Sequence, residues 1–101
     1  MVIKLFIILT MVVTGYCDAT GASPFEGMTA SGVYTNRFTT ACPPEMEFGT
    51  VIIMDGKIFI CEDRGGAIKG NRLDIWFPTC DDAILWGRQE KEVLILGARG
   101  K

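Results

Sequence analysis

The chain contains no histidine, and its 10 Lys and Arg residues are nearly balanced by 12 Asp and Glu residues. Without histidine, a Ser-His-Asp triad, a histidine metal site and the most common general base are excluded. The formal net charge of −2 and the lack of a Lys/Arg cluster give no electrostatic basis for binding nucleic acid. We therefore expect no metal, no cofactor and no nucleic-acid partner.

The cysteines also lack the Cys-X-X-Cys spacing that is typical of zinc and redox sites. Four widely separated cysteines are present, Cys17, Cys42, Cys61 and Cys80. An even number in a small domain favours one or two disulfides and an oxidising compartment. The sequence does not choose between the pairings, and four reduced, buried cysteines are the alternative.

What the chain does have is enough apolar sequence for one small core. Its 101 residues are 49% hydrophobic and 22% charged, which excludes a disordered composition. This length allows one domain, near the size at which cross-links help stability. Twelve glycines favour a turn-rich β protein.

The N-terminal residues allow two interpretations. Residues 1–13 carry one cation followed by an apolar run, as in a signal peptide, but the run is too short for a convincing membrane span. Met11–Cys17 also reads as the first strand of the domain. We therefore expect residues 1–10 to be a signal, an anchor or an extension of that strand, 11–97 to fold, and 98–101 to be a polar tail.

Short strands, tight turns and one short helix are predicted between these ends. Asp55-Gly56 is a strong hairpin signal, and Thr79 is a good N-cap because two acidic residues follow it in the first helical turn. The predicted segments are a loop at Asp18–Gly27, strands at Phe38–Ala41, Thr50–Met54, Lys57–Cys61, Arg72–Phe77 and Glu90–Leu96, and a helix at Ala83–Trp86.

The segment Ile58–Phe77 organises the rest of the chain. It reads as a strand that ends in acidic residues, a glycine-rich turn and a second strand. The turn glycines are expected to supply backbone freedom, including positive φ. They are Gly65, Gly66 and Gly70.

The second strand of this segment alternates strictly from Arg72 onward. Its apolar residues, Leu73, Ile75 and Phe77, should share one face, and the residues between them should share the other. That second face carries a cation, an acid and an aromatic ring, with Asp63 at the mouth of the turn. This grouping suits a sugar or a similar polar ligand, and solvated carboxylates beside a packing aromatic are the alternative.

The residues of Glu62–Phe77 resemble the core motif of the 3D-domain family, which is named for three aspartates. That family includes bacterial stationary-phase survival proteins and the catalytic barrel of a class of membrane-bound lytic transglycosylases. Thr29–Gly32, Thr-Ala-Ser-Gly, matches a further family element. The resemblance covers Val12 to Leu96 and implies a mainly β fold, a six-stranded double-psi β-barrel with one short helix.

Two positions depart from the family pattern. Asp63 and Asp74 stand at two of the three aspartate positions, but Cys42 stands where the first aspartate is expected, unless the loop has shifted. Arg64 stands where the family usually has threonine. These departures bear on the role of the first acid and on the shape of the groove.

The resemblance implies a peptidoglycan lytic transglycosylase. Asp74 would be the catalytic acid that cleaves the β-1,4 bond between N-acetylmuramic acid and N-acetylglucosamine and leaves a 1,6-anhydro product. Asp63 would be the second catalytic-site residue, as an orienting acceptor or as a structural loop cap. The expected substrate-binding residues are Thr29, Ser31, Gly65, Gly66, Lys69, Asn71 and Trp76.

The pKa of Asp74 decides whether this acid can work near neutral pH. Burial beside Trp76 or a like charge at Asp63 would raise it, and Arg72 would lower it. The expected partner is the glycan strand of peptidoglycan, in the cell envelope or outside the cell and including a phage-encoded role, with membrane contact only through an N-terminal signal or anchor. The rival functions are a non-catalytic wall-binding barrel and a disulfide-held interaction domain.

Overall fold

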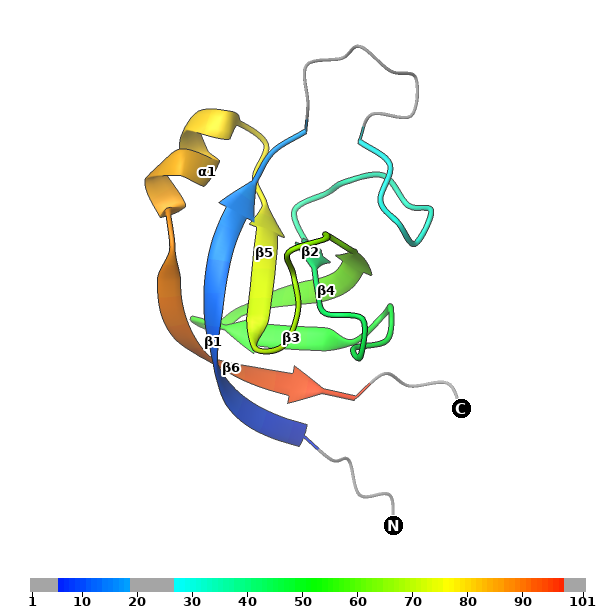
Figure 1. Ribbon diagram of the computed structural model, residues 1–101, viewed down its shortest axis with the longest axis vertical. Coiled ribbons are helices and arrows are strands. Elements are labelled where there is room, and N and C mark those ends of the chain that lie inside the picture. The colour runs from blue at the N-terminus through cyan, green and yellow to red at the C-terminus, as the bar shows by residue number, and fades with distance from the viewer. Residues whose placement is uncertain (1–5, 19–26, 98–101) are drawn as a thin grey trace.

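The computed structural model describes residues 6–18 and 27–97, which form a closed barrel of six strands with one short helix (Figure 1). The order of strands around the barrel is β1-β5-β2-β4-β3-β6. This confirms the expected mainly β, six-stranded barrel. The elements are β1 (Phe6–Tyr16), β2 (Thr39–Ala41), β3 (Val51–Met54), β4 (Lys57–Asp63), β5 (Arg72–Trp76), α1 (Cys80–Trp86) and β6 (Gln89–Leu96).

Some predicted segments fall outside the described residues. These are residues 1–5 of the expected leader or strand extension, most of the expected loop at 18–27, and the expected tail at 98–101. Over the described ranges, 6–18 and 27–97, no helix has the length and apolar character needed to cross a membrane.

The first strand connects the two sides of the barrel. Its N-terminal part pairs antiparallel with β6, from Phe6 opposite Leu96 to Val13 opposite Gln89. Its C-terminal part pairs parallel with β5, from Val12 to Tyr16. The strand begins at Phe6 and so includes residues 6–10, because the long β6 supplies partners for them (Figure 1).

The hairpin and the helix follow their local signals. Asp55 and Gly56 have φ angles of 53° and 75°, the positive values that the expected two-residue turn requires. Thr79 caps α1, since its Oγ1 accepts a hydrogen bond of 3.1 Å from the backbone N–H of Asp82. The helix starts at Cys80, directly after this cap, and the two acidic residues lie in its first turn as expected.

The prediction of positive φ was wrong for two of the three turn glycines. Gly70 has a φ of 67°, but Gly65 and Gly66 do not lie in the positive-φ region. A Cβ at Gly65 would lie only 3.0 Å from Cγ1 of Ile68, so a side chain here would crowd the turn. The backbone oxygen of Gly65 also accepts the N–H of Ile68, at 3.0 Å.

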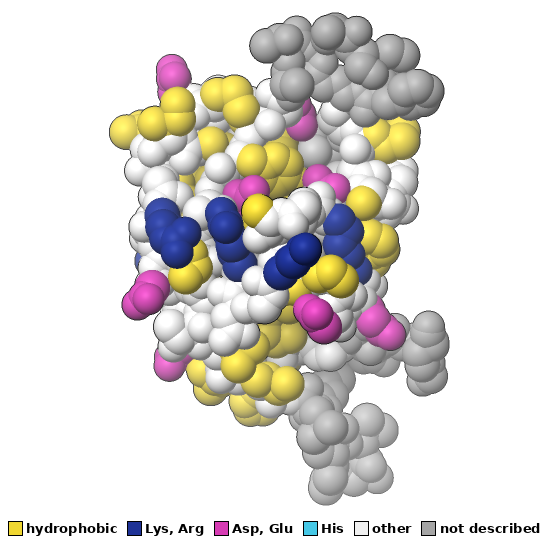
Figure 2. All heavy atoms as spheres, in the orientation of Figure 1, with side chains coloured by type: hydrophobic (Ala, Val, Ile, Leu, Met, Phe, Trp, Pro, Cys, Tyr) yellow, Lys and Arg dark blue, Asp and Glu magenta, His cyan; other side chains and the backbone are white. Residues whose placement is uncertain are grey.

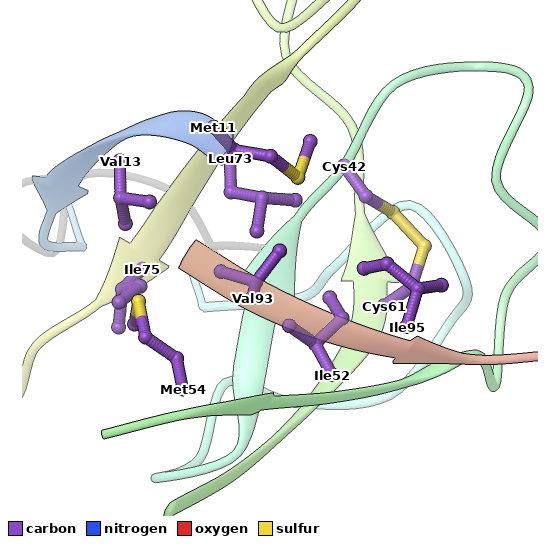
Figure 3. Packing of buried hydrophobic residues seen from close by; sticks show 10 residues of the cluster. All are labelled: Met11, Val13, Cys42, Ile52, Met54, Cys61, Leu73, Ile75, Val93 and Ile95. Carbon is purple, nitrogen blue, oxygen red and sulfur yellow. A yellow bond between two sulfur atoms is a disulfide. The ribbon is translucent and has the colours of Figure 1, made fainter. Parts of the chain in front are cut away.

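The interior of the barrel is filled by aliphatic and sulfur-containing side chains. Figure 3 shows ten of them, contributed by every strand or its end: Met11, Val13, Cys42, Ile52, Met54, Cys61, Leu73, Ile75, Val93 and Ile95. Each fully buried aliphatic side chain contributes about 1.5–3 kcal/mol to stability.

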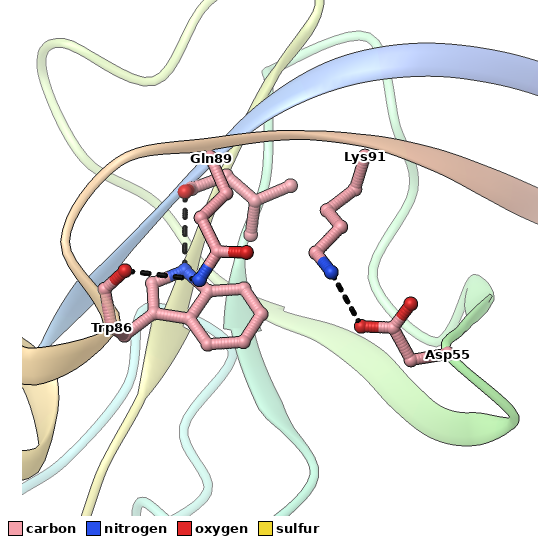
Figure 4. Close-up of polar contacts among 5 residues, drawn as sticks. Asp55, Trp86, Gln89 and Lys91 are labelled. Atoms are coloured by element: carbon pink, nitrogen blue, oxygen red, sulfur yellow. Dashed lines mark hydrogen bonds and ion pairs between the residues drawn. The ribbon is translucent and has the colours of Figure 1, made fainter.

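The helix is held against one end of this core through Trp86, which packs there. Its indole N–H donates to the backbone oxygen of Val13 at 3.1 Å, and its backbone oxygen accepts from the Gln89 amide at 3.0 Å (Figure 4). Beside it, Lys91 and Asp55 form an ion pair of 2.9 Å that joins β6 to the β3–β4 turn.

All four cysteines are paired, as Cys17–Cys80 and Cys42–Cys61. This confirms the expectation of disulfides, and the alternative of reduced cysteines was wrong. Cys42–Cys61 lies in the core, where both residues have no exposed surface. Cys17–Cys80 joins the end of β1 to the start of α1.

Candidate functional site

Asp74 lies on the outer face of β5, as the alternation predicts. Leu73 and Ile75 are buried in the barrel, and the three residues around them, Arg72, Asp74 and Trp76, are half-buried on the other face. In the orientation of Figure 1, Figure 2 shows two acidic side chains next to a row of Lys and Arg side chains on the visible face. The motif acid is therefore half-buried and shares its face of β5 with a cation and an aromatic ring.

A hydrogen bond from the neighbouring strand fixes the Asp74 carboxyl. Thr14 stands opposite Asp74 in the parallel pairing of β1 and β5, and its hydroxyl donates to Oδ1 at 2.9 Å. Burial raises the pKa of Asp74 above its ordinary value, and the charge of Asp63 adds to this. The Thr14 hydrogen bond and the charge of Arg72 lower the same pKa but do not cancel the rise.

Asp63 has a different environment, because three donors hold its carboxylate. Oδ2 accepts the hydroxyl of Tyr16 at 2.8 Å, and Oδ1 accepts the backbone N–H groups of Ala30 and Arg64, each at 2.9 Å. The side chain is therefore an acceptor that ties the end of β1 and the Thr29–Gly32 turn to the end of β4. These contacts are compatible with both roles considered for Asp63, an orienting acceptor and a loop cap.

Tyr16 contacts one of the two motif aspartates, Asp63. Burial raises the pKa of its hydroxyl, and the hydrogen bond to Asp63 and the charges of Asp63, Asp74 and Asp18 raise it further. The phenol is therefore protonated at neutral pH and serves as a donor. Because all three carboxylates act on this one hydroxyl, they belong to a single site around the end of β1.

Trp76 is oriented by the third carboxylate. Its indole N–H donates to Oδ1 of Asp18 at 3.1 Å, and Oδ2 of Asp18 accepts the hydroxyl of Thr35 at 3.0 Å. The tryptophan also borders a cavity of about 580 Å³ whose walls include Phe38, Ile58 and other apolar residues. Trp76 therefore stands between the acidic site and an apolar hollow.

The Thr-Ala-Ser-Gly element reaches the site through its backbone. Thr29 is buried, and its hydroxyl donates to the backbone oxygen of Val33 at 2.7 Å and lies 3.0 Å from the hydroxyl of Ser31. This is the hydrogen bonding of a Ser/Thr turn. Ser31 is exposed, and the contact with Asp63 comes from the Ala30 N–H between them.

The remaining expected binding residues lie in the loop between β4 and β5. All four, Gly65, Gly66, Lys69 and Asn71, are exposed. Within the part of the chain that the structure describes, no hydrogen bond joins the side chain of Lys69 or Asn71 to either aspartate. The side chains of Lys69 and Asn71 therefore lie open to solvent, whereas Ile68 of the same loop is buried.

Sequence reasoning missed Thr14, Tyr16 and Asp18, which contact the two motif aspartates and Trp76. Thr14 and Tyr16 alternate with the buried Val13 on β1, a signal that polar side chains occupy its outer face. The parallel pairing of β1 with β5, 60 residues apart for Thr14 and Asp74, is the information that was lacking.

The two departures from the family pattern contact each other. Arg64 directs Nη1 at the sulfur atoms of Cys42 and Cys61, at 2.7 and 3.2 Å, and Nη2 donates to the backbone oxygen of Met46 at 2.7 Å. Its guanidinium lies over the ring of Phe48, 4.0 Å from the centroid. A disulfide and a packed arginine thus occupy the place expected for the first aspartate.

The donor set of the site does not resemble a metal centre. Across residues 6–18 and 27–97, no group of three or more His, Cys, Asp or Glu side chains is arranged to hold a metal ion. The chemistry that the arrangement offers is acid–base chemistry at Asp74.

Comparison with known proteins shows the family of the chain. The family model for the 3D domain matches residues 39–97. The chain is 32% identical over 95 residues to the cell wall-binding protein YocH of Bacillus subtilis (strain 168), covering 87% of this chain and 32% of YocH. It is 30% identical over 92 residues to YabE of the same strain, whose name describes cell wall shaping, covering 85% and 23%.

Solved structures of the lytic transglycosylase MltA from Escherichia coli have a similar fold. One aligns with a TM-score of 0.60 and 22% identity over 79% of this chain and 29% of MltA, and another with a TM-score of 0.58 over 72% and 28%. The chain thus spans about a third or less of the length of these proteins. Because the family model matches more than half of the sequence, the chain belongs to the 3D domain family.

Proposed function

We propose that this protein is a peptidoglycan lytic transglycosylase in which Asp74 is the single general acid and base. The observation that carries the proposal is the state of Asp74, a half-buried carboxyl with a raised pKa on the outer face of β5. A general acid works best when its pKa approaches the working pH, and burial is the usual means of raising a carboxyl toward it. The 3D domain and the MltA-like barrel support the same proposal.

The reaction needs only this one carboxyl because the substrate supplies the nucleophile. Asp74 in its acid form donates a proton to the bridging oxygen as the bond to the muramic acid C1 breaks, and N-acetylglucosamine leaves with a hydroxyl at C4. The Asp74 carboxylate then accepts the proton of the muramic acid C6 hydroxyl as that oxygen attacks C1. A 1,6-anhydro ring forms, no water is consumed, and Asp74 returns to its acid form.

Asp63 would support Asp74 without exchanging protons with the substrate. Its oxygens already accept three hydrogen bonds, so it is poorly placed to activate a water molecule. Its charge contributes to the raised pKa of Asp74. These roles of the two carboxyl groups differ from those in ordinary glycosidases, in which both groups take part in the chemistry.

Opposite shifts of the pH–rate profile are expected when the two neighbours of Asp74 are changed. Thr14→Val removes a hydrogen bond that lowers the Asp74 pKa, so the alkaline limb of kcat/KM should move to higher pH. Asp63→Asn removes a like charge that raises it, so that limb should move to lower pH. Measuring kcat/KM against pH for both variants tests this, and shifts of the same sign would contradict the assignment.

A non-catalytic wall-binding barrel is the second candidate, because YocH is named as a cell wall-binding protein. We place the protein in the cell envelope or outside the cell in either case, since the two disulfides and the wall-related relatives agree on that location. In a binding module, the glycan would lie on the same face as Asp74 but would remain intact.

Incubation with purified insoluble peptidoglycan separates the two candidates. A transglycosylase releases soluble fragments over time and also sediments with the wall material, whereas a binding module only sediments with it. We expect release by the wild-type protein. Sedimentation without release, from folded protein and over a broad pH range, would favour the binding module. A protein that neither sediments with the wall nor releases fragments would contradict both candidates.

A further inference from the structure

Arg72 is a cation without a partner on the face of Asp74. It is half-buried two positions before Asp74 on β5, so both side chains lie on the same side of the strand. Within residues 6–18 and 27–97 its guanidinium makes no hydrogen bond and no ion pair, and its buried Nε has no acceptor. Arg64, by contrast, uses its guanidinium fully against Met46 and the disulfide.

The unpartnered guanidinium of Arg72 has two unfavourable effects. Burying an N–H group without an acceptor is unfavourable for the folded protein. The charge of Arg72 also lowers the pKa of Asp74 and so opposes the protonated form that the reaction requires. An anion bound at the Nη atoms of Arg72 would offset this charge.

We infer that Arg72 binds a carboxylate of the glycan substrate next to Asp74. The planar guanidinium matches a carboxylate with two parallel hydrogen bonds. This inference rests on the proposed function and names its substrate class, a muramic acid strand that bears free carboxylates. The carboxylate has two possible sources, the lactyl group of a stripped strand or the stem peptide.

Substrate binding would then assist the acid. A carboxylate paired with Arg72 offsets the positive charge near Asp74, so the pKa of Asp74 is higher in the complex than in the free protein. Strands without a carboxylate, such as chitin, would lack this effect. The protein would thus favour peptidoglycan through charge as well as through sugar shape.

Binding measurements on a non-cleaving background test the inference directly. Calorimetric titrations would compare Asp74→Asn with the double variant Asp74→Asn, Arg72→Gln. Three glycan strands would be used: one that carries stem peptides, one stripped to the free lactyl carboxylate, and one stripped strand in which that carboxylate is amidated. We expect Arg72→Gln to weaken binding of carboxylate-bearing strands by about tenfold to a hundredfold and to leave the amidated strand unchanged. The strand that loses affinity identifies the source.

The controls separate a binding role from a general effect of charge. Arg88→Gln removes the same charge from an exposed arginine between α1 and β6 and should change no affinity. Arg72→Lys should recover part of the affinity, because it keeps the charge and loses the planar fork. Equal affinities with and without Arg72, or an equal loss on the amidated strand, would overturn the inference.

The proposed function can fail separately. If the wild-type protein binds strands with this carboxylate dependence but releases no fragments, the transglycosylase proposal fails and the Arg72 site stands. If it releases fragments and Arg72→Gln binds all three strands as before, the activity stands and the Arg72 site is wrong.

Discussion

Fragment release from peptidoglycan is expected to fall by about a hundredfold to ten-thousandfold when Asp74 is replaced by asparagine, the range that general acid–base catalysis contributes. The amide can still accept the hydrogen bond of the Thr14 hydroxyl, so the site keeps its shape. It cannot donate a proton to the leaving oxygen or accept one from the C6 hydroxyl. Initial rates of soluble fragment release measure the loss.

Stability and binding serve as controls for this variant. Because the folded protein raises the Asp74 pKa, ionising this carboxyl destabilises the fold as the pH rises from about 4 through the folded pKa. Asp74→Asn removes that cost, so its unfolding midpoint at neutral pH should equal or slightly exceed that of the wild type. Unchanged fragment release by such a folded variant would show that Asp74 is not the acid.

Loss of the core disulfide should have the largest effect on stability. The double variant Cys42→Ala, Cys61→Ala opens a loop of sequence separation 19, which is expected to cost about 3 kcal/mol of unfolding free energy. Both residues are fully buried, and Arg64 loses the sulfur atoms toward which it points. The urea midpoint at constant slope measures the change.

The site should respond to this disulfide as well. The backbone N–H of Cys42 donates to the backbone oxygen of Asp63 at 3.1 Å, so loosening this segment reaches one of the aspartates. Two references show the effect of a general loosening of the fold. They are the oxidised wild-type protein at the same temperature and the variant Phe48→Leu, which lies beside Arg64. An unchanged midpoint in the double cysteine variant would mean that the barrel holds this segment without the cross-link.

Local signals predicted the parts of the site that one strand or one turn determines. The alternation of β5 depends only on neighbouring residues, so it placed Asp74, Arg72 and Trp76 on one face correctly. The Asp55-Gly56 hairpin and the Thr79 cap are equally local. Backbone geometry within a turn was less predictable, because Gly65 serves packing rather than a positive φ.

Contacts between distant segments were not predictable. Thr14 and Tyr16 belong to a strand whose parallel partner, β5, follows more than fifty residues later, and nothing in either strand specifies that register. The sequence also left the disulfide pairing open, because three-dimensional proximity alone selects Cys42 for Cys61. The direction of the Asp74 pKa shift likewise needed the burial that the barrel supplies.

The chemical end group of the released glycan tests the central claim most directly. Purified peptidoglycan would be incubated with the wild-type protein and with Asp74→Asn, and the soluble products identified by mass spectrometry. The account predicts 1,6-anhydro-muramic ends from the wild type and none from the variant. Reducing ends that have gained a water molecule would contradict it, since they would mean hydrolysis and a second working carboxyl group.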